Sequence, residues 1–176
     1  MLSDLSALIS ATTRWFTCSY PSGGSALEAT LCEAQARQAV TVAAWLRYPT
    51  PMDAALVAVA GPGGTDRLDW ITGVDASVDM MSVGRPAWRT WVDEVVASWS
   101  ASLLTDPSLA ARAVAGLTDG SHTAAVPVEF RRLIAPDDRS RRAAALLRHP
   151  DLLAPIAELH RPELLHRLAT GPALTA

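Results

Sequence analysis

The segment 26–47 constrains the fold of this chain more than any other. It follows Ser25, and the order Ser25-Ala-Leu-Glu28 predicts a capping box, in which the serine accepts a backbone amide hydrogen and the glutamate reaches back. Few strong helix breakers follow, and apolar or small side chains cover most of the helix circumference. Because a helix that is apolar nearly all round has to be covered on every side, we expect the other elements to pack around it.

The remaining chain is punctuated by helix starts. Capping residues and prolines predict helices over 3–17, 107–117, 127–134 and 137–148, a helix over 86–104 that begins at Pro86, and two short helices after His149 and Arg161. The predicted fold class is therefore mainly α. We expect residues 1–176 to form a single globular domain, a compact bundle of about seven or eight helices around the central helix 26–47.

Residues 55–74 fit two structures. Thr50-Pro51 begins an element that ends at the glycines of 61–64. The alanines of this element favour a helix. Its valines, and the following RLDWITGV (67–74), favour two strands that pair across the GPGGTD turn as a β-hairpin. Both remain open at the sequence level, and the hairpin would make the fold class α+β.

The composition excludes several chemistries. The chain has no lysine and no asparagine, and all fifteen basic residues are arginine, a bias typical of a GC-rich bacterial genome. Without lysine the chain has no P-loop lysine, no Schiff-base lysine and no kinase lysine. Its two cysteines, Cys18 and Cys32, form no CxxC motif, which argues against a zinc site. We expect no cofactor and no metal.

Charge and hydropathy bear on location and partners. The net charge of −3 favours neither nucleic acid nor an anionic membrane as a partner. The first ten residues carry Asp4 and no positive charge, unlike a secretory signal. The longest apolar run, 54–61, is too short to span a bilayer. We therefore expect a cytoplasmic protein with free thiols.

Three of the six tryptophans, Trp88, Trp91 and Trp99, fall within the expected helix 86–104. On one continuous helix they would share a face with the neighbouring valines. Burying one tryptophan stabilises a fold by about 4–6 kcal/mol, from the apolar area that it removes from water. We expect most of this stripe to be core, and the alternative is that it lines a ligand pocket or a partner groove. Trp88, at the helix start, is the candidate for a pocket rim.

Charged residues are unevenly distributed. Residues 49–125 hold nine acids and four arginines, whereas residues 126–148 hold three acids and six arginines. Guanidinium groups bind carboxylates and phosphates, so this second segment is a candidate docking site for an acidic partner. The alternative is a solvated face paired with local acids such as Asp138. The candidate binding arginines are Arg131, Arg132, Arg139, Arg141 and Arg142, and Arg148 belongs to the same segment.

Two further groupings are weaker. The loop TDGSHT (118–123) contains His122 beside a serine and an aspartate, but neighbours on one turn rarely converge as a catalytic triad does. His160 and His166, with a glutamate between them, are possible zinc ligands. However, Pro162 begins a helix between the two histidines and leaves His160 outside it.

Two functional hypotheses follow. The first is a non-enzymatic protein that acts through protein–protein interaction or self-association, as a subunit, adaptor or regulatory partner, with the arginine-rich segment and part of an apolar groove as its docking surface. The second is a small enzyme or carrier whose apolar pocket, bounded by tryptophans, takes an aromatic or apolar small molecule. In the second hypothesis His122 or Asp93 would be the general base.

Overall fold

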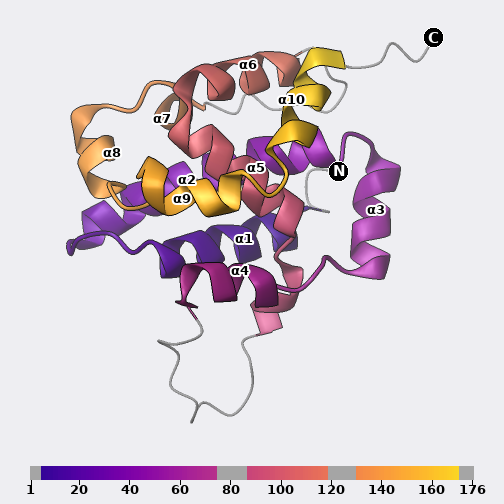
Figure 1. Ribbon diagram of the computed structural model, residues 1–176, viewed down its shortest axis with the longest axis horizontal. Helices are drawn as coiled ribbons and strands as arrows, with labels where there is room; N and C mark the ends of the chain where they lie inside the picture. The colour runs from indigo at the N-terminus through magenta and orange to yellow at the C-terminus, as the bar shows by residue number, and fades with distance from the viewer. Residues whose placement is uncertain (1–4, 75–86, 119–129, 171–176) are drawn as a thin grey trace.

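The computed structural model describes residues 5–74, 87–118 and 130–170, and this part of the chain is helical and contains no strand (Figure 1). The mainly α prediction is confirmed. The elements are α1 (Ser6–Ser19), α2 (Ala26–Arg47), α3 (Pro51–Ala60), α4 (Asp66–Thr72), the 3₁₀ helix η2 (Ala87–Trp91), α5 (Glu94–Thr105), α6 (Pro107–Thr118), α7 (Arg131–Ile134), α8 (Asp138–Ala143), α9 (Pro150–Ala157) and α10 (Arg161–Thr170).

Helix α2 begins as the sequence predicts. The hydroxyl of Ser25 accepts a hydrogen bond from the backbone N–H of Glu28 at 3.1 Å, and the Glu28 carboxylate accepts one from the Ser25 N–H at 3.2 Å. The first turn is mostly exposed, and buried side chains run from Leu31 to Leu46. Along this length α2 packs against α1, α5, α6, α7 and α8. The elements that carry the arginine-rich segment are therefore anchored on α2.

Of the two structures that the sequence left open for residues 55–74, the helical one is found, as α3 and α4 on either side of the loop 61–65, and the β-hairpin alternative is wrong. Thr50 and Asp53 form a second capping box, and Pro51 occupies the first turn of α3, where its missing N–H costs nothing. Gly61 and Gly73 end α3 and α4 with positive φ angles of 72° and 70°, conformations that glycine adopts without strain. These caps satisfy backbone groups at the helix ends, and the alanines of α3 have a high helix propensity. Together the two effects outweigh the strand preference of its valines.

The expected continuous helix 86–104 is also wrong. Residues 87–91 form the 3₁₀ helix η2, the chain is extended at Asp93, and α5 starts at Glu94. The Asp93 carboxylate accepts hydrogen bonds from the backbone N–H groups of Val95 and Val96 at 2.8 and 3.4 Å, so it is the N-cap of α5. Pro86, the predicted start, lies outside the described residues. Trp88 and Trp91 therefore precede the helix that carries Trp99.

Several other boundaries differ from expectation. Ser3 and Asp4, the expected caps of the first helix, lie outside the described residues, as does the expected start of 127–134. Helix α8 ends at Ala143, and residues 144–148 form turns rather than the expected continuation. These turns bring Arg148 back toward the body of the molecule, where its side chain is half-buried.

Small residues set the packing of α5. Ala97, Ser98, Ala101 and Ser102 are fully buried, and small side chains let helix backbones approach closely. The hydroxyls of Ser98 and Ser102 both donate to the carbonyl of Ala157 in α9, at 2.9 and 3.3 Å. The buried hydroxyls are thus satisfied, and they fix the position of α9 on α5.

Candidate functional site

The three tryptophans of the predicted stripe do not form one site. Trp99 is 4% exposed, and its indole N–H donates to the carbonyl of His160 at 3.1 Å. Trp88 and Trp91 are half-buried and pack against the edge of the core. The Trp88 ring lies between two guanidinium groups, 5.5 Å from Arg14 and 5.6 Å from Arg89. The aromatic rings are therefore parts of the packing, and Trp99 also borders a hollow.

The hollow beside Trp99 has a volume of about 520 Å³ and lies between α10 and the end of α2. It is open to solvent rather than enclosed. Charged side chains surround the indole, and the lining residues are Arg47, Trp99, Pro162, Glu163, His166, Arg167 and Thr170. A site for an apolar molecule normally encloses most of its ligand, whereas this hollow is open to solvent and has charged residues beside Trp99 and Pro162.

Asp93 is engaged in structural hydrogen bonds. Its Oδ1 caps α5, its Oδ2 accepts the hydroxyl hydrogen of Tyr48, and the residue is 8% exposed. Burial, together with this hydrogen bond to Asp93, raises the pKa of Tyr48. Through its two oxygens the Asp93 carboxylate thus connects Tyr48, at the end of α2, to the first turn of α5. The other candidate base, His122, lies outside the described residues.

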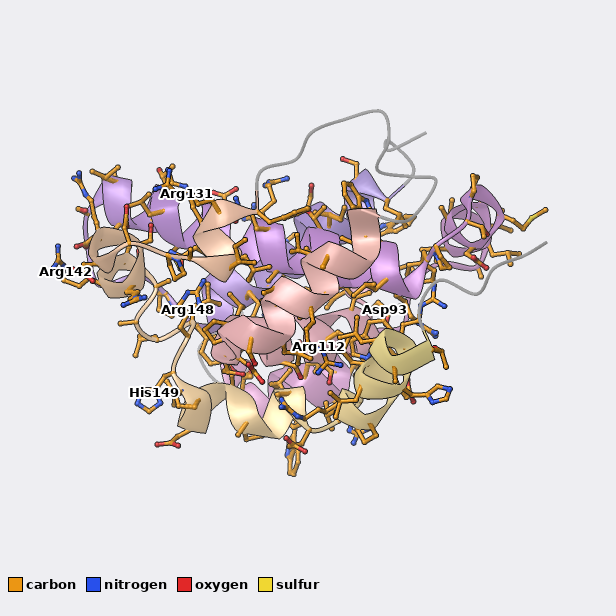
Figure 2. The ribbon with its side chains drawn as sticks, turned by 90° about the horizontal axis from the view of Figure 1, so that it is seen from above. Asp93, Arg112, Arg131, Arg142, Arg148 and His149 are labelled. Carbon is orange, nitrogen blue, oxygen red and sulfur yellow. The ribbon has the colours of Figure 1, made fainter. Side chains whose placement is uncertain are left out.

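The structure separates the five candidate arginines into two groups. Arg131 and Arg132 line a hollow of about 270 Å³ between α2, α7 and α8. Arg139, Arg141 and Arg142 belong to α8 and are exposed, and Arg142 points away from the body of the molecule (Figure 2). Within this second group, Arg141 forms an ion pair with Asp138 at 3.8 Å, on the surface. Only the first two arginines share a concave site.

Arg148 has a structural role that the sequence did not distinguish. Its guanidinium donates to the carbonyls of Leu104, Arg132 and Leu133, at 3.1, 2.8 and 3.2 Å. Its Nε donates to the amide oxygen of Gln35 at 2.5 Å. Burial, with a smaller contribution from the charge of Arg141, lowers the pKa of Arg148 to about 10. Figure 2 shows Arg148 further inside than Arg142.

The most exposed apolar surface lies on α3, which sequence reasoning did not single out. Met52, Leu56 and Val59 are 70%, 58% and 88% exposed. Their spacing of four and three residues places them on one face of the helix, opposite the buried Ala54 and Val57. Helix α3 lies at one end of the molecule in both views and makes no extensive contact with another described helix (Figures 1 and 2).

A second exposed apolar side chain is Trp70 of α4, at 82% exposure. The helical period predicts this exposure once Leu68 is taken as a core residue, because a residue two positions further along a helix points to the opposite side. Leu68 is indeed fully buried. The exposure of Trp70 could not be predicted while both helix and strand were possible for 67–74, because in a strand Leu68 and Trp70 would share a face.

The two candidate zinc-ligating histidines are separated. The Nε2 of His160 lies 2.8 Å from a carboxylate oxygen of Glu94, and its Nδ1 lies 3.4 Å from one of Glu163. His166 instead lines the hollow beside Trp99. Within residues 5–74, 87–118 and 130–170 no three histidine, cysteine or acidic side chains are grouped closely enough to hold a metal ion. Both cysteines are free thiols, Cys18 exposed and Cys32 buried.

Comparisons of the chain with protein-family models, with curated proteins and with solved structures gave no match. Of the helices in the described residues, none combines the length and the hydropathy that a membrane crossing requires.

Proposed function

We propose that the chain is a non-enzymatic helical protein that acts by binding another protein chain, and that the apolar face of α3, formed by Met52, Leu56 and Val59, is the docking surface. The observation that supports this most directly is the exposure of these three side chains on one helix face. Single exposed apolar residues are ordinary, but apolar residues gathered on one face are typical of interaction sites. The apolar docking surface is therefore placed on α3 rather than on the tryptophan stripe.

The chemistry of α3 supports a protein as the occupant. Its only charged residue is Asp53, whose carboxylate is used in the capping box. The face of Met52, Leu56 and Val59 thus has no charge to desolvate when another apolar surface covers it. An amphipathic helix or an apolar groove of a partner matches such a face, with anchors spaced four and three residues apart.

The absence of an assembled reactive group among the described residues is the reason for preferring this class to the enzyme or carrier. Asp93 caps a helix, and the hollow at Trp99 is open to solvent, with five charged or polar residues among the seven that line it. The enzyme or carrier hypothesis requires an enclosed apolar cavity, and the hollow at Trp99 is open to solvent.

Site-specific photocrosslinking in the source cells tests the proposal. A photoreactive phenylalanine analogue replaces Val59 in one variant and Leu152 of α9, which is 43% exposed, in a matched control. We expect one discrete adduct from position 59 and none from position 152. The mass of the adduct distinguishes a second copy of this chain from a different protein.

A further substitution checks that the adduct depends on the apolar face. Leu56→Asp places a charge beside position 59 on an exposed site, so the fold is expected to be retained. The adduct from position 59 should disappear in this background. The proposal is wrong if position 59 gives no adduct, or if the adduct persists unchanged with Leu56→Asp.

A further inference from the structure

A polar hollow lies between α2, α7 and α8. Its lining residues are Gln38, Arg131, Arg132, Ala135, Asp137 and Ser140. The guanidinium of Arg132 donates to the hydroxyl of Ser140 at 3.3 Å, which holds this arginine at the wall. The side-chain oxygen of Gln38 accepts the backbone N–H of Leu133 at 2.9 Å, which fixes α7 against α2. The site is thus built on anchored elements.

Positive charge exceeds negative charge around this hollow. Residues 131–148 contain six arginines and two aspartates. Asp138 pairs with Arg141 on the surface, at 3.8 Å. Asp137 is in the lining, and its carboxylate accepts the backbone N–H of Ser140 at 2.7 Å. Hydrogen bonds to Ser140, and the nearby charges of Arg132 and Arg131, lower the pKa of Asp137, so this acid stays ionised and offsets one of the two arginines in the lining.

Arg148 adds a second layer of positive charge behind the hollow. Its guanidinium donates hydrogen bonds to neutral acceptors, which are the side-chain oxygen of Gln35 and the carbonyls of Leu104, Arg132 and Leu133. Gln35 connects the two layers, since its oxygen accepts from Arg148 while its amide group donates to the carbonyl of Ser140 at 2.8 Å. A charge held by neutral dipoles in a partly buried position is screened less than one in water, so it contributes to the potential in the hollow.

We propose that this hollow is an oxyanion-binding site, which takes a phosphate group between the side chains of Arg131 and Arg132. The planar guanidinium group offers paired N–H donors that match the oxygens of a phosphate. A phosphate carries close to two negative charges at neutral pH. These charges balance the positive charges of Arg131, Arg132 and the more deeply placed Arg148 after Asp137 has offset one of them. The volume of about 270 Å³ suits a small anionic group better than a large ligand.

Two sources share this chemistry: free inorganic phosphate, and the phosphoryl group of a small organic molecule. Inorganic phosphate and glycerol 3-phosphate, titrated separately into the ¹⁵N-labelled chain at constant ionic strength, distinguish them. We expect saturable shifts of the amide signals of Ser140 and Leu133 and of the side-chain amide of Gln38. Tighter binding of the phosphomonoester would identify an organic phosphate as the ligand, and equal or weaker binding would identify free phosphate.

Two charge-matched variants separate a local site from the general field of the arginine-rich segment. Arg131→Gln removes one lining guanidinium, and Arg142→Gln removes an exposed one that points outward (Figure 2). We expect Arg131→Gln to weaken phosphate binding about tenfold or more, the usual cost of losing a charge-assisted hydrogen bond. Arg142→Gln should weaken binding less than about threefold, because an exposed and distant charge is screened.

Melting curves followed by circular dichroism show whether both variants remain folded. Both positions are exposed, so unchanged melting temperatures are expected. The proposal is overturned if neither probe gives saturable shifts at these amides. It is equally overturned if Arg142→Gln weakens binding as much as Arg131→Gln does, since non-local attraction would then account for the binding. Neither result depends on α3, so the test is independent of the proposed function.

Discussion

Asp69 is a fully buried carboxylate where α1, α4 and η2 meet, and it provides the sharpest test of how this fold is held together. It accepts the indole hydrogen of Trp15 at 2.8 Å and the hydroxyl hydrogen of Thr65 at 3.0 Å. It also forms an ion pair with Arg89 at 3.1 Å, in which the two side chains are 0% and 5% exposed. Asp69→Asn keeps the size of the side chain and removes its charge, so the buried ion pair with Arg89 is broken.

The expected loss follows from that burial. Breaking a buried ion pair by removing one partner costs about 3–5 kcal/mol, a large part of the roughly 5–15 kcal/mol by which a domain is stable. For a chain of this size the melting temperature should fall by about 6–20 °C. Replacing both residues, as in Asp69→Asn with Arg89→Met, should recover much of the loss, because both charges are then removed together and the amide oxygen at position 69 still accepts from Trp15.

Urea unfolding followed by tryptophan fluorescence and by circular dichroism measures these differences. The exposed pair Arg37 and Glu33, 3.3 Å apart on α2, is the control, and Glu33→Gln should change the free energy of unfolding by less than about 1 kcal/mol. If Asp69→Asn costs no more than Glu33→Gln, or if the double variant is less stable than Asp69→Asn alone, the buried pair does not have the role assigned to it.

Two further predictions concern stability. Arg148→Met should lower the free energy of unfolding by about 2 kcal/mol in urea titrations, because the carbonyls of Leu104 and Leu133 lose their donor, whereas Arg142→Met on the surface should change it by less than about 0.5 kcal/mol. Equal effects of the two substitutions would contradict this. Burial raises the pKa of Tyr20 from 10.0 to about 12, so between these pH values the unfolded tyrosine loses its proton while the folded one keeps it. Stability should therefore be retained below about pH 10 and should fall by up to about 2 kcal/mol as the pH rises to 12. Tyr20→Phe should show a smaller alkaline loss in urea titrations at pH 9 and pH 12, and an unchanged loss would refute the assignment.

The helix starts were the most predictable part of this fold. A helix start depends on hydrogen bonds and backbone angles that neighbouring residues determine, so a local sequence pattern predicts it. This holds for Ser25 with Glu28 at the start of α2 and for Thr50 with Pro51 at the start of α3. Asp93 is equally local, since its carboxylate caps α5. Its role as an N-cap was not predicted, because the tryptophans keep a regular helical spacing across the break between η2 and α5.

The parts that were not predictable depend on contacts between distant segments. Asp69 is buried because Trp15, which is 54 residues away, reaches it, and no local pattern marks such a partner. Arg148 and Arg142 look alike in the sequence, yet a turn after α8 directs one inward and leaves the other exposed. The exposure of the α3 face was not predictable for a similar reason. An apolar helix is expected to be covered by other elements, and the tertiary arrangement decides whether it is.

The exposure of Val59 offers the most direct test of the central proposal, that another protein covers α3. In a chain carrying Cys18→Ser and Val59→Cys, the rate of maleimide labelling is compared between the purified protein at low concentration and the source cells, each normalised to Leu152→Cys. Val59 is 88% exposed in the isolated chain, so rapid labelling of the purified protein is expected. In cells we expect labelling at least about tenfold slower, as a buried interface requires, and fast labelling again when Leu56→Asp is added. Equal normalised rates in the purified protein and in cells would contradict the proposal.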